Sequence, residues 1–140
     1  MAYRLIEHTA DVGIEATGRT LEELFRECLG ALTDCLTRRR DIEPVDCFEV
    51  ELAAPDLGQL LVDFLQESIF LYETVGVVFA DARVAVRQDR GAWHLTAELV
   101  GEVHDPDRHG LGTLIKAVTY HQLRVERHDD GWRARVILDI

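Results

Sequence analysis

The sequence predicts a single α+β domain, residues 1–140, in which a mostly antiparallel sheet packs against two helices. Two stretches carry apolar residues at helical spacing behind a residue that suits a helix N-cap, and the other stretches alternate between apolar and polar residues. Short turns join most neighbouring strands, which favours antiparallel pairing. With 47% hydrophobic residues, a chain of 140 residues can bury a core of its own.

The first helix is predicted over about 20–36, after two short strands at 3–8 and 12–17. Thr20 followed by Glu23 is a capping box, the pattern in which both side chains bind free backbone N–H groups at the start of a helix. Behind this pair, apolar residues recur at helical spacing: Leu21, Leu24, Phe25, Cys28, Leu32 and Cys35. They define the buried face of the helix.

The second helix is predicted to begin after Asp56, its N-cap, and a half-buried strand at 47–53 precedes it. After Gly76 the period of two returns. We expect four more strands there: 82–87, 93–99, 115–127 and 132–139. The last two form a closing hairpin. The order strand, helix, strand occurs twice, which hints at an internal duplication.

Composition limits the partners of the chain. The 15 basic and 26 acidic residues give a net charge of −11, and a surface this acidic repels phosphate backbones, so we expect no independent, high-affinity binding of nucleic acid. No apolar run approaches the roughly 18 residues of a membrane span, and the N-terminus lacks the apolar stretch of a signal peptide. We therefore expect a cytoplasmic protein without a membrane partner. Its three cysteines, Cys28, Cys35 and Cys47, are interpreted as buried, reduced small hydrophobic residues.

Acidic groups near the two ends of the sequence could bind a cation. Asp11 lies in the link between the first two strands, and Asp139 is followed only by Ile140. If these groups are neighbours, two side-chain carboxylates and the α-carboxylate share a small volume, and a divalent cation would relieve their repulsion. Hard oxygen ligands favour calcium, magnesium or manganese over zinc. An ordinary turn aspartate and a solvated chain end are the alternative, and the residues alone leave both open.

A third polar group follows Glu102. We expect a polar, mobile loop at 103–113, a segment rich in charged residues, histidine and glycine. Its two histidines, His104 and His109, match no zinc signature without a third ligand. Lys116 then opens a strand, either as a solvated side chain or as part of an anion site. The sequence has no glycine-rich phosphate loop, no nucleophile elbow and no cysteine–histidine signature. Because no nucleophile is supplied with a base, an accessory role is favoured over an enzyme.

Two separated motifs resemble the archease family. The first is 7–14, Glu-His-Thr-Ala-Asp-Val-Gly-Ile, followed by Gly18 and the run 21–25. The second is 116–121, Lys-Ala-Val-Thr-Tyr-His, followed by 132–140 up to the last residue. Their order and spacing extend the resemblance over the whole chain.

This resemblance implies a fold in which one strand–helix–strand–strand module is inserted into another. It also implies a function: activating the tRNA-splicing RNA ligase, which joins 3′-phosphate to 5′-hydroxyl ends, by promoting its guanylylation and multiple turnover. By the same resemblance Asp11, Asp139 and a main-chain or terminal oxygen of Ile140 hold a divalent cation, often assigned to calcium, and Lys116 serves the activation of the partner. His8 and Glu102 are possible groups around that site.

Two other functions remain open at this point. One is a metal-dependent phosphoester hydrolase that uses Asp11, Asp139 and a histidine. The other is a chaperone-like module that binds proteins without a metal. Turnover of a phosphoester by the protein alone would favour the first of these.

Overall fold

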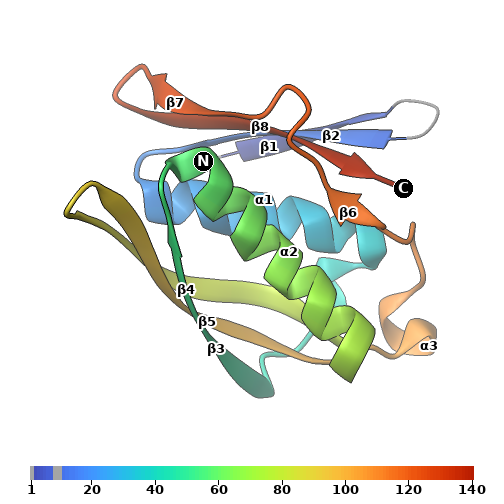
Figure 1. Cartoon of the computed structure of the whole chain (residues 1–140). Helices are drawn as coiled ribbons and strands as arrows, with labels where there is room; N and C mark the ends of the chain where they lie inside the picture. Colours follow the sequence, from blue (N-terminus) through green and yellow to red (C-terminus); the bar gives the residue numbers. More distant parts are fainter. Residues whose placement is uncertain (1, 8–10) are drawn as a thin grey trace.

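Two antiparallel sheets enclose a pair of helices in the computed structural model, which describes residues 2–7 and 11–140 (Figure 1). The longer helices are α1 (Leu21–Leu36) and α2 (Leu57–Val75), and two short ones are η1 (Arg39–Asp41) and α3 (Pro106–His109). The strands are β1 (Ala2–Glu7), β2 (Asp11–Gly18), β3 (Asp46–Ala54), β4 (Val77–Asp89), β5 (Ala92–Val103), β6 (Ala117–Val118), β7 (Arg124–His128) and β8 (Gly131–Asp139).

The sheet topology confirms the α+β class and the inserted module. In the first sheet, called sheet A, β2 pairs with β1 and β8, while β6 and β7 both pair with β8. In sheet B, β5 lies between β3 and β4. All strands of sheet B come from 46–103, a contiguous segment between α1 and β6, so this strand–helix–strand–strand unit interrupts the unit that forms sheet A. The strands thus form two sheets, where the alternation had suggested one.

Both long helices begin at their predicted capping residues. The Oγ1 atom of Thr20 accepts a hydrogen bond from the Glu23 N–H at 3.1 Å, and Asp56 accepts one from the Gln59 N–H at 2.8 Å. These bonds satisfy backbone donors that have no partner inside the helix. The C-terminal end of α2 is Gly76 with φ of +76°, a left-handed conformation that glycine adopts without strain.

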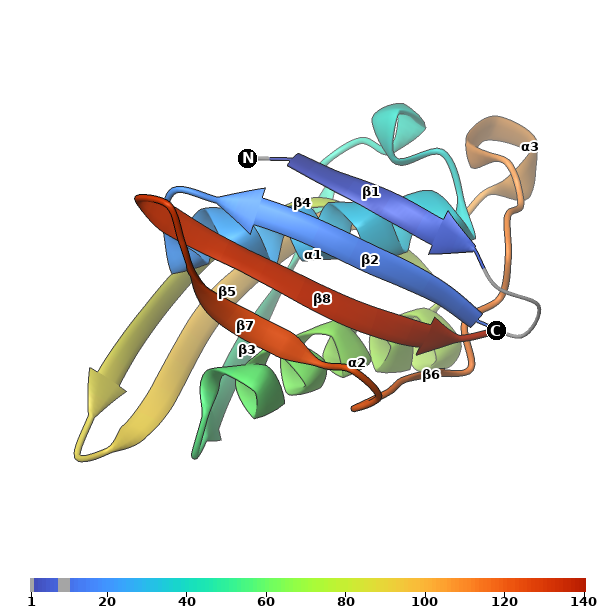
Figure 2. The same ribbon diagram turned by 90° about the horizontal axis from the view of Figure 1, so that it is seen from above.

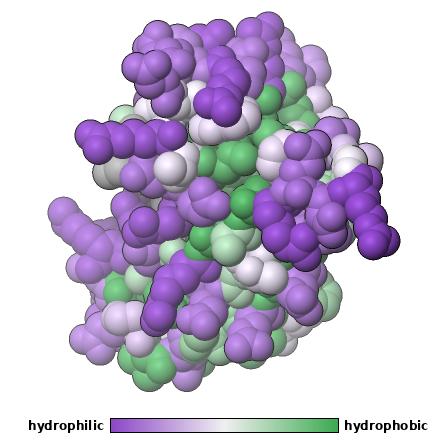
Figure 3. All heavy atoms as spheres, turned by 90° about the vertical axis from the view of Figure 1, so that its left-hand side faces the viewer, coloured by the Kyte–Doolittle hydropathy of each residue, from purple (hydrophilic) through white to green (hydrophobic). Residues whose placement is uncertain are grey.

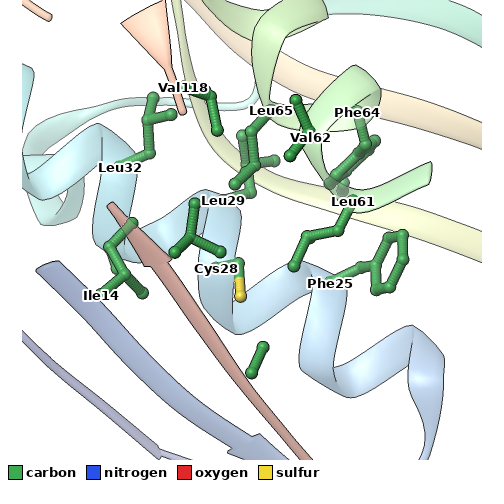
Figure 4. Close-up of a cluster of buried hydrophobic side chains, with 14 of the residues drawn as sticks. Ile14, Phe25, Cys28, Leu29, Leu32, Leu61, Val62, Phe64, Leu65 and Val118 are labelled. Atoms are coloured by element: carbon green, nitrogen blue, oxygen red, sulfur yellow. The ribbon is translucent and has the colours of Figure 1, made fainter. Parts of the chain in front are cut away.

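The core lies between the two sheets and is formed largely by the two helices (Figure 4). The rings of Phe25 and Phe64 are 5.8 Å apart where α1 meets α2. Each is fully buried, a contribution of about 1.5–3 kcal/mol from apolar burial. Seen from the side in Figure 3, apolar surface is visible between more hydrophilic regions.

The cysteines differ in burial, and the expectation for one of them is wrong. Cys28 is fully buried in the core, and this burial raises the pKa of its thiol to about 12. Cys35 is half-buried, but Cys47 is exposed on β3, because it belongs to the outward-facing residues of that strand. All three are free thiols, as expected.

Two predicted segments need correction. The strand expected over 115–127 is broken into β6 and β7, because Thr119 turns its N–H and hydroxyl groups toward the carbonyl oxygen of Ile137 and a turn follows at 120–123. The mobile loop expected over 103–113 contains α3 and the fully buried side chain of His109. Hydrogen bonds described below hold this segment in place.

Candidate functional site

Strands β2 and β8 lie side by side in sheet A (Figure 2), and Asp11 and Asp139 are direct partners across this antiparallel pair. Strand alternation explains their orientation: Val12 and Ile14 of β2, with Leu138 of β8, face the helices, so both aspartates face the opposite side of sheet A. Side chains opposite each other in such a pair have Cβ atoms about 4.5–5.5 Å apart. The structure therefore brings together two of the predicted cation ligands.

Apolar side chains lie next to this pair of carboxylates on the same face. Gly13 is the following residue of this face on β2, between Ile6 of β1 and Ile137 of β8. A Cβ atom at Gly13 would lie 3.3 Å from both isoleucine side chains, and Ile137 is buried although it faces away from the helices. The missing side chain lets the two isoleucines cover this part of the sheet. A low-polarity surrounding strengthens the attraction between carboxylates and a cation.

Lys116 and Ile140 reach the same place from other parts of the chain. The N–H of Lys116 donates to the carbonyl oxygen of Asp139 at 2.8 Å, and the next residue, Ala117, is the β6 partner of Asp139. The Lys116 side chain is exposed, and Lys116 is the only lysine in the sequence. Ile140 packs its side chain against the core, which holds its backbone beside the aspartates. His8 lies outside the described residues.

The candidate ligands suit a hard cation, although they are few in number. Two carboxylates and a main-chain or terminal oxygen are the oxygen ligands that calcium, magnesium and manganese prefer. In the described part of the chain, no three side chains of His, Cys, Asp or Glu meet in a metal-binding group. A cation held by Asp11, Asp139 and Ile140 would therefore keep several positions for water or for oxygens of another molecule.

Glu102 lies in a different cluster, at the end of β5. Its Oε1 atom accepts hydrogen bonds from His109 Nε2 at 2.6 Å, Arg108 Nη2 at 2.7 Å and the Glu43 N–H at 3.1 Å. The Arg108 guanidinium, followed by the Glu43 N–H and the His109 ring, lowers the pKa of this carboxyl group to about 2. The contacts of Glu102 are thus made to α3 and to the segment before β3.

His104 is the second histidine of this cluster. We call Glu102, His104, Arg108 and His109 the Glu102–His109 cluster. The Nδ1 atom of His109 accepts the Asp105 N–H at 2.9 Å, so its ring proton is on Nε2 and points to Glu102. The ring of His104 stacks on that of His109, with centroids 5.9 Å apart, and His104 Nε2 donates to the Gly110 carbonyl. The hydroxyl of Tyr72 in α2 lies 3.2 Å from His104 Nδ1. The spacing of these two histidines in the sequence gives no sign that the His109 side chain is buried.

The segment between α3 and Lys116 is fixed to the end of α1. The Gly112 N–H binds the Leu36 carbonyl at 2.8 Å, and the Thr113 N–H binds the Cys35 carbonyl at 2.7 Å. A Cβ atom at Gly112 would lie 2.2 Å from the Cys35 oxygen, so only glycine permits this approach. The position of Lys116 therefore depends on the end of α1 as well as on β8.

The fold and the paired carboxylates define a small α+β protein with one module inserted into another. A sequence model of the Archease protein family matches residues 3–140. The protein archease of Thermococcus gammatolerans is 40% identical over 135 residues, which are 96% of this chain and 95% of that protein. That of Methanopyrus kandleri is 39% identical over 140 residues and the full length of both chains. The chain belongs to the archease family.

Solved structures agree with this assignment. The solution structure of protein 1598 of Methanobacterium thermoautotrophicum has a TM-score of 0.79 and 30% identity, and the match covers 99% of this chain and 98% of that one. The crystal structure of an archease from Thermotoga maritima, described as a possible chaperone, has a TM-score of 0.55 and 27% identity over 98% and 96% of the two chains. None of the helices in the described residues is long and apolar enough to cross a membrane.

Proposed function

We propose that this chain is an accessory protein that activates the tRNA-splicing RNA ligase, promoting guanylylation of the ligase and its multiple turnover. The observation that carries the proposal is the meeting of three distant segments: Asp11 opposite Asp139, with Lys116 bonded to the Asp139 carbonyl. These are the positions that the family resemblance assigns to a cation site and to partner activation. We also propose that the chain acts in the cytoplasm.

In this proposal Asp11, Asp139 and an oxygen of Ile140 hold a divalent cation, with calcium as first choice and magnesium or manganese as alternatives. The bound cation supplies positive charge that neutralises the carboxylates and attracts phosphate oxygens. Lys116 repels that cation, so its ammonium group serves an anion of the ligase or of the nucleotide. It can do so because its side chain is exposed while its backbone is fixed.

The chain is proposed to act without being an enzyme itself. The described residues around Asp11 and Asp139 supply carboxylates, aliphatic side chains and Lys116, but no serine, cysteine or threonine nucleophile paired with a base. A metal-dependent phosphoester hydrolase, the alternative enzyme, would release product from a model phosphoester without the ligase. The Thermotoga maritima relative is described as a possible chaperone. A chaperone would protect a client protein from aggregation without needing Lys116.

The decisive experiment is a multiple-turnover ligation assay with the cognate ligase. We expect the wild-type chain to increase turnover, and Lys116→Ala and Asp11→Ala to abolish most of that increase while the far-ultraviolet circular dichroism stays unchanged. Arg83→Ala is the matched control, since Arg83 is an exposed cation of sheet B. Normal stimulation by both folded site variants would contradict the proposal.

The single lysine allows a direct test of contact. Reductive methylation of the purified chain modifies only Lys116 and the α-amino group. If the ligase covers Lys116, its presence slows methylation of that residue but not of the N-terminus, as measured by mass spectrometry. Equal protection of both groups, or of neither, would argue against docking through Lys116.

A further inference from the structure

A shallow groove of about 450 Å³ runs over the outer face of sheet A, away from the helices. Its charged lining comes from four strands and consists of Arg4, Glu15, Arg124, Glu126, Arg133 and Arg135. Four arginines thus face two glutamates, although the chain as a whole has a net charge of −11. The groove is a basic region on an acidic protein.

Strand register places four of these charges in one row across the sheet. Arg4 of β1 is opposite Glu15 of β2, Glu15 is opposite Arg135 of β8, and Arg135 is opposite Arg124 of β7. Glu15 is shared, because its carboxylate lies 2.6 Å from Arg4 Nη2 and 3.4 Å from Arg135 Nη1. One carboxylate therefore serves two guanidinium groups.

Arg124 is left without an ion pair among the described residues. It faces Arg135, and like charges directly opposite each other destabilise a strand pair. In the adjacent row Arg133 binds Glu126 at 2.6 Å. That arginine holds the pKa of the Glu126 carboxyl group below its usual range, and Arg124 acts in the same direction. An anion between Arg124 and Arg135 would relieve their repulsion.

The spacing of the arginines indicates an extended anion. From β1 to β7 there are three inter-strand steps, or about 14 Å at about 4.8 Å each, which is too far for one phosphate to bridge. A chain with several anionic groups can reach across the row. Guanidinium groups bind phosphate oxygens through paired N–H donors, which favours a phosphate-bearing strand.

The uncharged lining argues against a protein partner at this groove. Protein interfaces are usually anchored by aromatic or large aliphatic side chains at their centre. Along the described lining, no aliphatic side chain is larger than alanine, and the aromatic rings are those of Tyr3, which packs against the core, and of the exposed His128. The His128 ring is the one exposed aromatic ring of this lining on which a base could stack, so contact would be made mainly to the sugar–phosphate backbone.

We propose that this groove binds the sugar–phosphate backbone of a single-stranded nucleic acid, weakly and without sequence preference. The proposal goes beyond ligase activation and does not depend on the cation site. Weak binding agrees with the net charge, which opposes high affinity. RNA and DNA strands of equal length should bind equally, because nothing in the groove reads the 2′-hydroxyl group specifically.

The test is fluorescence anisotropy of a labelled ten-nucleotide oligouridylate titrated with the full chain between about 50 and about 200 mM salt. We expect affinity to fall with salt. The double variant Arg4→Gln/Arg124→Gln should bind more weakly and lower the slope of log K against log salt by about 1.4, from about 0.7 for each lost phosphate contact. The matched control is Arg83→Gln/Arg87→Gln on the outer face of sheet B, which changes the net charge equally.

Four results would overturn the proposal. One is failure of the wild type to bind at about 50 mM salt. Another is an equal loss of affinity in both double variants, which would assign the effect to net charge alone. Displacement of the strand by hexaglutamate as efficiently as by an unlabelled oligonucleotide would assign the groove to acidic peptides. Displacement by GTP or inorganic phosphate at the same total phosphate concentration would reduce it to a site for a single anion. The proposal is supported if Arg4→Gln/Arg124→Gln alone loses affinity and only an unlabelled oligonucleotide displaces the strand.

Discussion

Asp11 and Asp139 are like charges in direct opposition, an arrangement that destabilises a strand pair. Sheet B holds a comparable pair, Glu49 opposite Glu98, in which Glu98 also lies 3.6 Å from Arg83. On the same face of sheet A, the aliphatic side chains of Ile6 and Ile137 lie next to the aspartate pair. In the function proposed above, a divalent cation neutralises both aspartates.

The proposed cation site predicts opposite responses to removing one carboxylate, depending on whether the cation is present. Without divalent cation, Asp139→Asn should raise the Tm slightly, since the repulsion is relieved. With calcium at about 100 times its Kd, the wild type should gain about 2.7 kcal/mol, while the variant should gain little. Differential scanning calorimetry with and without calcium, magnesium or manganese measures both effects.

Glu49→Gln is the matched control, because it relieves the repulsion in sheet B without touching the candidate site. It should leave the cation response of the wild type intact. If calcium, magnesium and manganese each leave the Tm of the metal-stripped wild type unchanged, the proposed cation site is contradicted.

Glu102 leads to a prediction about acid stability. Its pKa is about 2 in the folded protein and near 4.5 when unperturbed, so the folded state favours the charged form. The resulting stabilisation is fully present above about pH 4.5 and is lost as the pH falls toward 2. Glu102→Gln should therefore lower stability at pH 7 and reduce the loss between pH 4.5 and 2, as measured by urea unfolding. If Glu102→Gln leaves the dependence of stability on pH unchanged, the Glu102–His109 cluster does not contribute to acid stability.

At the scale of elements, the segment 110–116 connects the Glu102–His109 cluster to Lys116. Gly112→Ala would force a methyl group against the Cys35 oxygen, 2.2 Å away, and displace this segment from the end of α1. We expect a loss of about 1–3 kcal/mol, typical of overpacking, and reduced ligase stimulation because Lys116 moves. Thr113→Ala is the control, since its backbone bond to Cys35 remains. Equal stability of the two variants would show that this contact is unimportant.

Elements could be predicted where their signal is local. Thr20 and Asp56 predict where their helices begin, because a capping side chain accepts a hydrogen bond from the N–H group three residues away. The division of the strands into two sheets could not be predicted, since it depends on which distant strands pair. The same limit applies to His109, whose burial depends on Glu102 of β5 and on Thr37 at the end of α1, whose hydroxyl donates to the His109 carbonyl oxygen. For Asp11 and Asp139, the sequence supplied the family motif and the structure supplied the register that brings them together.

At the scale of the whole molecule, the shared core predicts that both modules unfold together. The helices pack on each other and on both sheets, so neither sheet keeps its apolar face covered alone. The chain has one tryptophan in each sheet, Trp93 in β5 and Trp132 in β8. In Trp93→Phe and in Trp132→Phe, the remaining fluorescence and the far-ultraviolet circular dichroism should report the same urea midpoint. Separate midpoints within either variant would reveal an independently stable module.

The pairing of β2 with β8 also bears on how the protein is made. β2 leaves the ribosome before β8, and its second edge has no partner until 131–139 have been synthesised. The segment 46–103, which is contiguous, can pair its own strands in the meantime. A chain interrupted before β8 therefore carries Asp11 without Asp139 and an open strand edge, a feature that promotes aggregation. Completion of the candidate site and protection of the nascent chain are thus the same event.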